Sequence, residues 1–227
     1  MMELDDIVPS EISFHKQLFA SNFSHIFLVT IRGQPCVMKH HGRGPRRYYE
    51  PEDREVDIHV LETTAYRRLQ AKGVCDRGIV PRFLGSMRKF DPALCQPYLE
   101  KFLEDEYPPS ALFLEYIPNM EMVDIHNFTP ERADKLIYGI REIHKALVLH
   151  NDPRPRNMIV APGTEGEEER VLWIDFDRAE TYDQDTITDR QKYFLFEEEQ
   201  IVIEFKEVME MDCKKGEIEE AYLFFCT

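Results

Sequence analysis

The segment from residue 143 to residue 177 combines three oxygen-bearing side chains with two short β-prone stretches. Asp152 lies in the triplet His-Asn-Asp, Asn157 precedes the first stretch, and Asp175 follows the second. Mg²⁺ prefers oxygen ligands, and carboxylate and amide groups supply them. The segment is therefore typical of a site that binds Mg²⁺ and positions a hydroxyl group. In an alternative interpretation, His150 and Asp152 cap the preceding helix and Asp175 begins an ordinary turn.

The spacing of these residues resembles the catalytic and metal-binding loops of the protein kinase-like superfamily, H-x-D-x-x-x-x-N followed by D-F-G. The resemblance implies that Asp152 orients the acceptor hydroxyl or accepts its proton, and that Asn157 and Asp175 hold Mg²⁺. Arg154 matches a lysine that often follows the catalytic aspartate in the family. Because no arginine directly precedes Asp152, the segment is more similar to small-molecule kinases of the choline and aminoglycoside type than to Ser/Thr or Tyr kinases. Asp177 stands where the family has glycine.

The N-terminal part of the chain carries a second group of matches. Residues 24–39 contain two β-rich runs around Gly33, which predict a hairpin. The second run ends at Lys39 and resembles the kinase strand whose lysine contacts the α- and β-phosphates of ATP. Residues 20–25 stand where the family has a Gly-rich loop, but they contain no glycine. Their alternative hydroxyl and amide donors are Ser21, Asn22 and Ser24.

A helix and a strand complete this group. Apolar residues recur at three- and four-residue steps between residues 56 and 72, which predicts an amphipathic helix in the position of the kinase αC helix. Glu62 matches the glutamate that pairs with the strand lysine, and Glu55 is the alternative. Residues 111–117 predict a strand that resembles the fifth kinase strand and its hinge. The family binds adenine through the hinge backbone, which here implies Glu115, Tyr116 and Ile117.

The remaining segments give simpler predictions. Thr129 as N-cap and Pro130 at the first helical position predict a helix that leads into the catalytic loop. Residues 189–212 predict one long acidic helix that packs against it. Residues 1–20 show little periodicity, so we expect an extension that packs on the first lobe. Residues 88–109 are polar and contain prolines, and we expect an irregular insertion.

Composition limits the class of protein. The formal net charge of −15 argues against general nucleic-acid binding, because the phosphate backbone would be repelled. No stretch has the length of a membrane span, and the acidic start lacks the features of a signal peptide, so we expect a cytoplasmic protein outside the membrane. The cysteines are odd in number, widely spaced and without C-x-x-C, so we expect free thiols. They are Cys36, Cys75, Cys95, Cys213 and Cys226.

Together these features predict an α+β protein with a two-lobe, protein kinase-like fold. Residues 1–117 would form an N-terminal lobe from the extension, an antiparallel sheet, the αC-like helix and the hinge strand. Residues 118–227 would form a reduced helical C-terminal lobe with the catalytic and metal-binding loops. The region after Asp177 is short and lacks the A-P-E motif of protein kinases.

The expected function is ATP- and Mg²⁺-dependent transfer of a phosphoryl group to a hydroxyl of a small molecule. The acidic composition favours a cationic acceptor, such as an amino alcohol or aminoglycoside. One alternative is a pseudokinase or truncated kinase-like scaffold that acts as a binding module. Another is a small kinase-like ATPase that works in a complex, with a protein partner completing its site.

Overall fold

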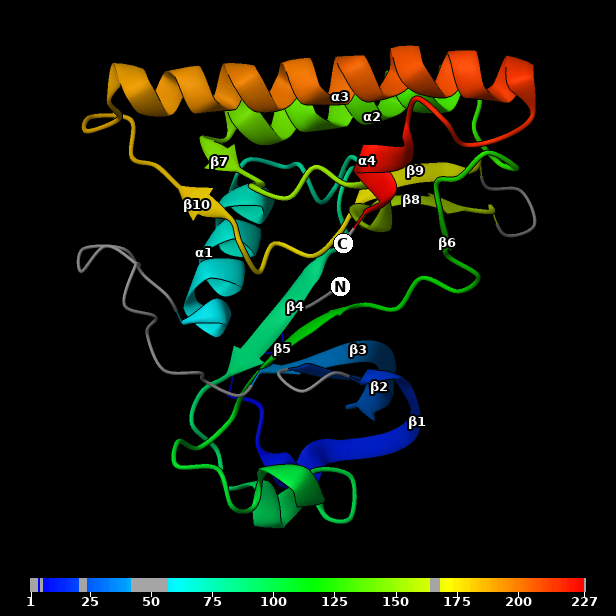
Figure 1. The fold of residues 1–227 in the computed structure, drawn as a ribbon. Coiled ribbons are helices and arrows are strands. Elements are labelled where there is room, and N and C mark those ends of the chain that lie inside the picture. Colours follow the sequence, from blue (N-terminus) through cyan, green and yellow to red (C-terminus); the bar gives the residue numbers. More distant parts are fainter. Residues whose placement is uncertain (1–3, 5, 21–23, 42–56, 164–167, 227) are drawn as a thin grey trace. The chain divides into compact units, whose positions relative to one another are not determined.

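The computed structural model describes residues 4, 6–20, 24–41, 57–163 and 168–226. They form a mixed α+β structure with a five-stranded antiparallel sheet and, within the described residues, four α-helices (Figure 1). The chain divides into two compact units. The first contains Met1–Thr63 and Arg82–Tyr116, and the second contains Thr64–Pro81 and Ile117–Thr227. Residues 64–81, which the sequence analysis counted with the N-terminal lobe, cluster with the second unit.

The first unit is built on the five-stranded sheet. Its strands follow the order β1-β2-β3-β5-β4, and every neighbouring pair is antiparallel. They are β1 (Ile12–Ala20), β2 (Ser24–Ile31), β3 (Gln34–His41), β4 (Phe83–Met87) and β5 (Ser110–Glu115).

The predicted hairpin is confirmed as β2 and β3. Ile31 pairs with Gln34, so the connection is the two-residue turn Arg32-Gly33. Both turn residues have positive φ, 49° for Arg32 and 80° for Gly33. Two-residue turns with positive φ match the twist of paired strands, and glycine adopts this conformation without steric cost.

The prediction of a loosely patterned extension over residues 1–20 is wrong for its second half. Residues 12–20 form β1, an edge strand whose side chains are mostly exposed, and two irregularities interrupt its register with β2. An exposed and bulged strand shows no clear alternation in sequence, which explains why the pattern missed it. Leu4, in the first half, does pack on the sheet, because its N donates to Leu84 O at 2.5 Å. A Cβ on Gly85 would lie 2.4 Å from Leu4 O, so glycine permits this approach.

Residues 88–109 contain two short 3-10 helices, η2 (Pro92–Cys95) and η3 (Glu100–Phe102). Cys95, Leu99 and Phe102 are buried in the same apolar cluster as the sheet residues Phe27 and Phe113. The insertion is therefore irregular, as expected, but it also covers part of the sheet.

The second unit is helical around small strand pairs. Figure 1 shows α2 and α3 side by side, as the sequence predicted for the long acidic helix, and these two helices are in contact. Besides residues 64–71 of α1, its elements are α2 (Pro130–Lys145), α3 (Asp189–Lys215), α4 (Tyr222–Phe225), β6 (Glu121–Met122), β7 (Val148–Leu149), β8 (Met158–Ala161), β9 (Arg170–Trp173) and β10 (Glu180–Thr181). β6, β8 and β9 form one sheet, and β7 pairs with β10.

Local sequence explains how these helices begin and end. The Thr129 side chain accepts a hydrogen bond from Arg132 N at 3.2 Å, which caps α2 as expected. Thr188 and Gln191 form a capping box at the start of α3. α3 ends at Gly216, whose φ is 84°. The predicted αC-like helix is α1 (Ile58–Ala71).

Two further expectations from the sequence concern the cysteines and membrane-spanning helices. All five cysteines are free thiols, as expected. In the described part of the chain, no helix combines the length and apolar character that a membrane crossing needs.

Candidate functional site

The predicted catalytic loop follows β7 in the second unit. Asn151 has a φ of 66°, a left-handed conformation that asparagine tolerates better than most residues. The loop then closes on itself, because Arg154 N donates to Asp152 O at 2.8 Å and Asn157 N donates to Arg154 O at 2.9 Å. Pro155 starts the short 3-10 helix η4 (Pro155–Asn157). These backbone bonds bring Asp152, Arg154 and Asn157 into one compact turn.

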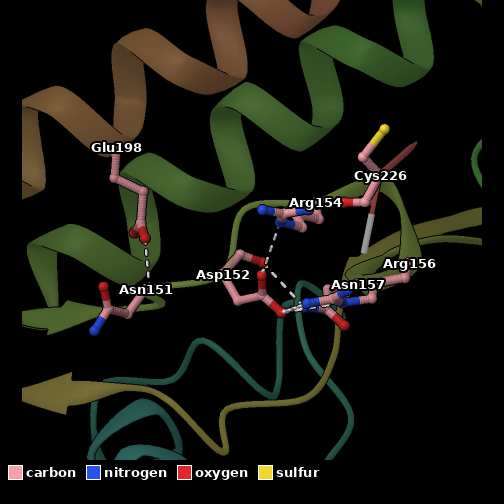
Figure 2. A network of polar contacts seen from close by, with 7 residues as sticks. All are labelled: Asn151, Asp152, Arg154, Arg156, Asn157, Glu198 and Cys226. Atoms are coloured by element: carbon pink, nitrogen blue, oxygen red, sulfur yellow. Dashed lines mark hydrogen bonds and ion pairs between the residues drawn. The ribbon is translucent and has the colours of Figure 1, made fainter. Parts of the chain in front are cut away.

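Asp152 is the centre of a polar network within this turn (Figure 2). Its side chain is only 5% exposed. Its Oδ2 accepts hydrogen bonds from Asn157 Nδ2 at 2.9 Å and from Arg156 Nη2 at 2.8 Å and Nε at 3.2 Å. Its Oδ1 lies 3.5 Å from Arg154 Nε. The two carboxylate oxygens are therefore unequal, and Oδ1 has the weaker contact.

Asn157 is oriented by the same network. Its Nδ2 donates to Asp152 Oδ2 and, at 3.0 Å, to Asp152 O. Because the amide nitrogen is engaged in this way, the amide oxygen Oδ1 is the atom that Asn157 can offer to a cation. The described residues donate no hydrogen bond to it. This arrangement fits a Mg²⁺ ligand.

Asp175 is connected to the catalytic loop through its neighbours. Ile174 N donates to Asn157 O at 3.1 Å, and His150 Nε2 donates to Ile174 O at 3.0 Å. The Phe176 ring lies against the rings of His150 and Tyr66, with centroids 4.6 and 5.1 Å apart. Asp175 itself has a φ of 66°. The residues on both sides of Asp175 are thus bound to the loop or to α1, which holds its position.

The cation that the resemblance implies would bind to few protein ligands. Among the described residues, no group of three or more His, Cys, Asp and Glu side chains is suited to hold a metal. Asn157 and Asp175 still fit Mg²⁺, since Mg²⁺ at phosphate-transfer sites takes one or two carboxylates and completes its shell with phosphate oxygens and water. These two residues would supply only part of a Mg²⁺ coordination shell.

Sequence reasoning missed Glu198. This α3 residue is 4% exposed and accepts hydrogen bonds from His150 N at 3.0 Å and Asn151 N at 2.5 Å. His144 Nε2 donates to it at 2.8 Å, so this histidine is more than a packing residue. A signal was present in the sequence: Glu198 continues the three- and four-residue spacing of the buried residues of α3. They are Leu195, Glu198, Val202, Phe205, Met209 and Asp212.

The second polar member of that stripe, Asp212, anchors the segment after α3. Its carboxylate accepts hydrogen bonds from Glu219 N at 2.9 Å, Glu220 N at 3.0 Å and Ala221 N at 2.9 Å. Burial alone would raise the pKa of Asp212, but the amide hydrogen bonds outweigh it and the pKa is lowered. The segment continues to Cys226, whose carbonyl accepts a hydrogen bond from Arg154 Nη1 (Figure 2).

The first unit contains the predicted lysine–glutamate pair. Lys39 in β3 donates to Glu62 Oε1 in α1 at 2.9 Å. The two side chains are 8% and 0% exposed. Removing one member of a buried ion pair lowers the stability of the fold, because the other charge stays buried without it. The alternative partner Glu55 and the loop residues Ser21 and Asn22 lie outside the described residues, whereas Ser24 begins β2.

The predicted hinge residues behave differently from one another. Glu115 N donates to Arg82 O at 2.9 Å, and the Glu115 carboxylate accepts from Arg82 N at 3.1 Å. The Glu115 N–H group therefore already donates a hydrogen bond within the protein. The predicted backbone contact with adenine would have to come from Tyr116 and Ile117. The Ile117 side chain is buried in an apolar cluster of the second unit with Ile159, Ala161 and Leu172.

The structure thus groups the predicted residues by unit. The second unit holds Asp152, Arg154, Asn157 and Asp175 around one loop, and the first holds Lys39 and Glu62 as a pair. No protein-family model matches the chain, and no curated protein is significantly similar to it in sequence.

Proposed function

We propose that the protein transfers a phosphoryl group from ATP to a hydroxyl group of a small molecule, within a two-lobe kinase-like fold. The observation that carries the proposal is the geometry of the second unit. Asp152 and Asn157 share a hydrogen-bonded turn. Ile174, which precedes Asp175, donates from its amide to Asn157 O in that turn and accepts at its carbonyl from the His150 side chain. A hydroxyl-orienting carboxylate beside two magnesium ligands is the arrangement that phosphoryl transfer needs.

The resemblance to kinases implies a role for each residue. Asp152 would accept the proton of the acceptor hydroxyl through Oδ1, the oxygen with the weaker contact. Asn157 Oδ1 and Asp175 would hold Mg²⁺, which neutralises phosphate charge when it is bound. Arg154 would stabilise charge on the transferred phosphoryl group. Lys39 would contact the α- and β-phosphates, and Glu62 would orient its ammonium group.

Nucleotide binding tests the proposal at Asp175. Thermal unfolding would be measured with ADP or ATP, with and without Mg²⁺, for the wild type and for Asp175→Ala. Ligand at 100 times its dissociation constant adds about 2.7 kcal/mol of stability. This corresponds to a rise of roughly 5 to 10 °C in Tm for a chain of this size. We expect a Mg²⁺-dependent rise in the wild type that Asp175→Ala loses and the matched control Asp185→Ala, at an exposed residue, keeps.

Turnover separates the role of Asp152 from nucleotide binding. Asp152→Asn should keep the Mg²⁺-dependent thermal shift but lose about 10²- to 10⁴-fold in acceptor-dependent ADP release. Undiminished turnover in Asp152→Asn would contradict its role as the proton acceptor. A wild type without any nucleotide-dependent shift would contradict the proposed function as a whole.

A second candidate is a kinase-like binding module without catalysis. Two observations favour it: Arg156 and Asn157 already satisfy Asp152 Oδ2, and Arg82 O already accepts the Glu115 amide. A protein of this class would show no acceptor-dependent ADP release in any condition, whether or not a nucleotide shifts its Tm. An ATPase that needs a protein partner would show the shift only after the partner, co-purified in stoichiometric amount, is present.

A further inference from the structure

The charge next to Asp152 is opposite in sign to the charge of the chain as a whole. Two guanidinium groups, those of Arg154 and Arg156, contact this single carboxylate, so two positive charges face one negative charge. The chain carries a formal net charge of −15. Asp152 and the two groups in direct contact with its carboxylate therefore carry a net positive charge.

The arginines are also the accessible part of this network. The side chains of Arg154 and Arg156 are 40% and 34% exposed, whereas the Asp152 side chain is 5% exposed. Arg156 uses Nε and Nη2 on Asp152, and the described residues give it no hydrogen bond through Nη1. A guanidinium group donates in a planar fork that matches the oxygens of a carboxylate or a phosphate. Arg156 can therefore bind an acidic group that approaches Asp152 from solvent.

We propose that the acceptor carries a carboxylate or phosphate close to its reactive hydroxyl, and that Arg156 binds this acidic group. The inference rests on the proposed function and narrows its substrate class. It replaces the cationic acceptor expected from overall composition, because an ammonium group beside Asp152 would be repelled by both guanidinium groups. Close contacts outweigh the distant surface charges, which solvent and salt screen.

Arg156 can also turn toward such an acceptor. It holds Asp152 Oδ2 through two of its N–H groups. An acidic group on the acceptor competes for those N–H groups, and the Arg156 side chain is partly exposed.

Four compounds built on one three-carbon scaffold test the charge preference. They are glycerol, D-glycerate, glycerol 3-phosphate and 3-amino-1,2-propanediol, which present a neutral, a carboxylate, a phosphate and an ammonium group. Acceptor-dependent ADP release from MgATP gives kcat/KM for each compound. We expect an acidic compound to exceed glycerol by about tenfold or more, since a charge-assisted hydrogen bond contributes at this level. Whichever of D-glycerate and glycerol 3-phosphate has the higher kcat/KM shows whether the acidic group of the acceptor is a carboxylate or a phosphate.

Variants of Arg156 connect the preference to this side chain. Arg156→Gln should reduce the ratio of the acidic compound to glycerol by about tenfold, mainly through KM, and Arg156→Lys should restore part of it. Arg88→Gln removes the same charge from an exposed position in the first unit and should leave both the rates and the ratio unchanged.

Three results would overturn the inference: the ammonium compound is the best acceptor, neither acidic compound releases ADP, or Arg156→Gln leaves the ratio unchanged. The Mg²⁺-dependent thermal shift at Asp175 distinguishes two kinds of failure. If the Mg²⁺-dependent shift is present, the proposal of an acidic acceptor is rejected and the proposed function stands. If the shift is also absent, the proposed function fails together with the inference.

Discussion

Replacing Glu198 by alanine removes a buried carboxylate that accepts hydrogen bonds from His150 N, Asn151 N and His144 Nε2. Each buried amide left without a partner costs about 1 to 3 kcal/mol. Asn151 is exposed, so water can reach its amide, and we therefore expect about 2 to 4 kcal/mol for the two amides together. A loss of this size lowers Tm by roughly 4 to 16 °C for a chain of this length.

Urea unfolding followed by tryptophan fluorescence is a suitable assay. Trp173 is the single tryptophan of the chain, is fully buried in the second unit, and donates to Leu136 O at 3.1 Å. Its emission therefore reports on the unit that contains the catalytic loop. Glu198→Gln should lie between the wild type and Glu198→Ala, because its single amide oxygen can keep only part of the three hydrogen bonds that the carboxylate accepts. Glu204→Ala, at an exposed position of the same helix, serves as the control and should change stability by less than about 0.5 kcal/mol.

Amide hydrogen exchange supplies the local readout for the same variants. The amides of His150 and Asn151 should exchange faster in Glu198→Ala than in Glu204→Ala, because their acceptor is lost. Acceptor-dependent turnover should fall as well, since Asp152 follows directly in the loop. Two results would refute the reasoning: a stability loss in Glu198→Ala no larger than in Glu204→Ala, or unchanged exchange at both amides.

Two more predictions concern buried charges. Lys39→Met should lower the unfolding free energy by about 3 to 5 kcal/mol, because the buried Glu62 carboxylate would lose the Lys39 ammonium group, and the double variant Lys39→Met/Glu62→Leu should recover most of the loss in chemical unfolding. A single variant as stable as the wild type would contradict the pairing. The pKa of Asp212 is lowered below 3.8, so its stabilising effect should be present above that pH and lost as the pH falls through the lowered pKa. Wild type and Asp212→Asn should therefore differ in stability at neutral pH and converge in strong acid, and a pH-independent difference between them would refute this assignment.

Local patterns determined most of the secondary structure. The Thr129 cap, the apolar spacing in residues 58–71 and the turn at Gly33 each depend on neighbours within a few residues, so the sequence alone was sufficient to predict them. The edge strand β1 was missed because exposure on both faces removes the alternation that marks a strand. The insertion over residues 88–109 was recognised as irregular, but its packing through Phe102 depends on a sheet formed by distant segments.

The candidate site also combines features that local sequence predicts with features that depend on tertiary packing. The sequence by itself determined which residues are candidates for the proposed chemistry, because the spacing from Asp152 to Asn157 and the position of Asp175 after an apolar strand are local features. Only the tertiary structure decided their partners. Glu198 on the catalytic-loop amides and Cys226 O on Arg154 join residues that are 47 and 72 positions apart in the chain. Contacts over such separations depend on how α3 and the segment after it pack against the rest of the second unit. No local sequence pattern predicts that packing.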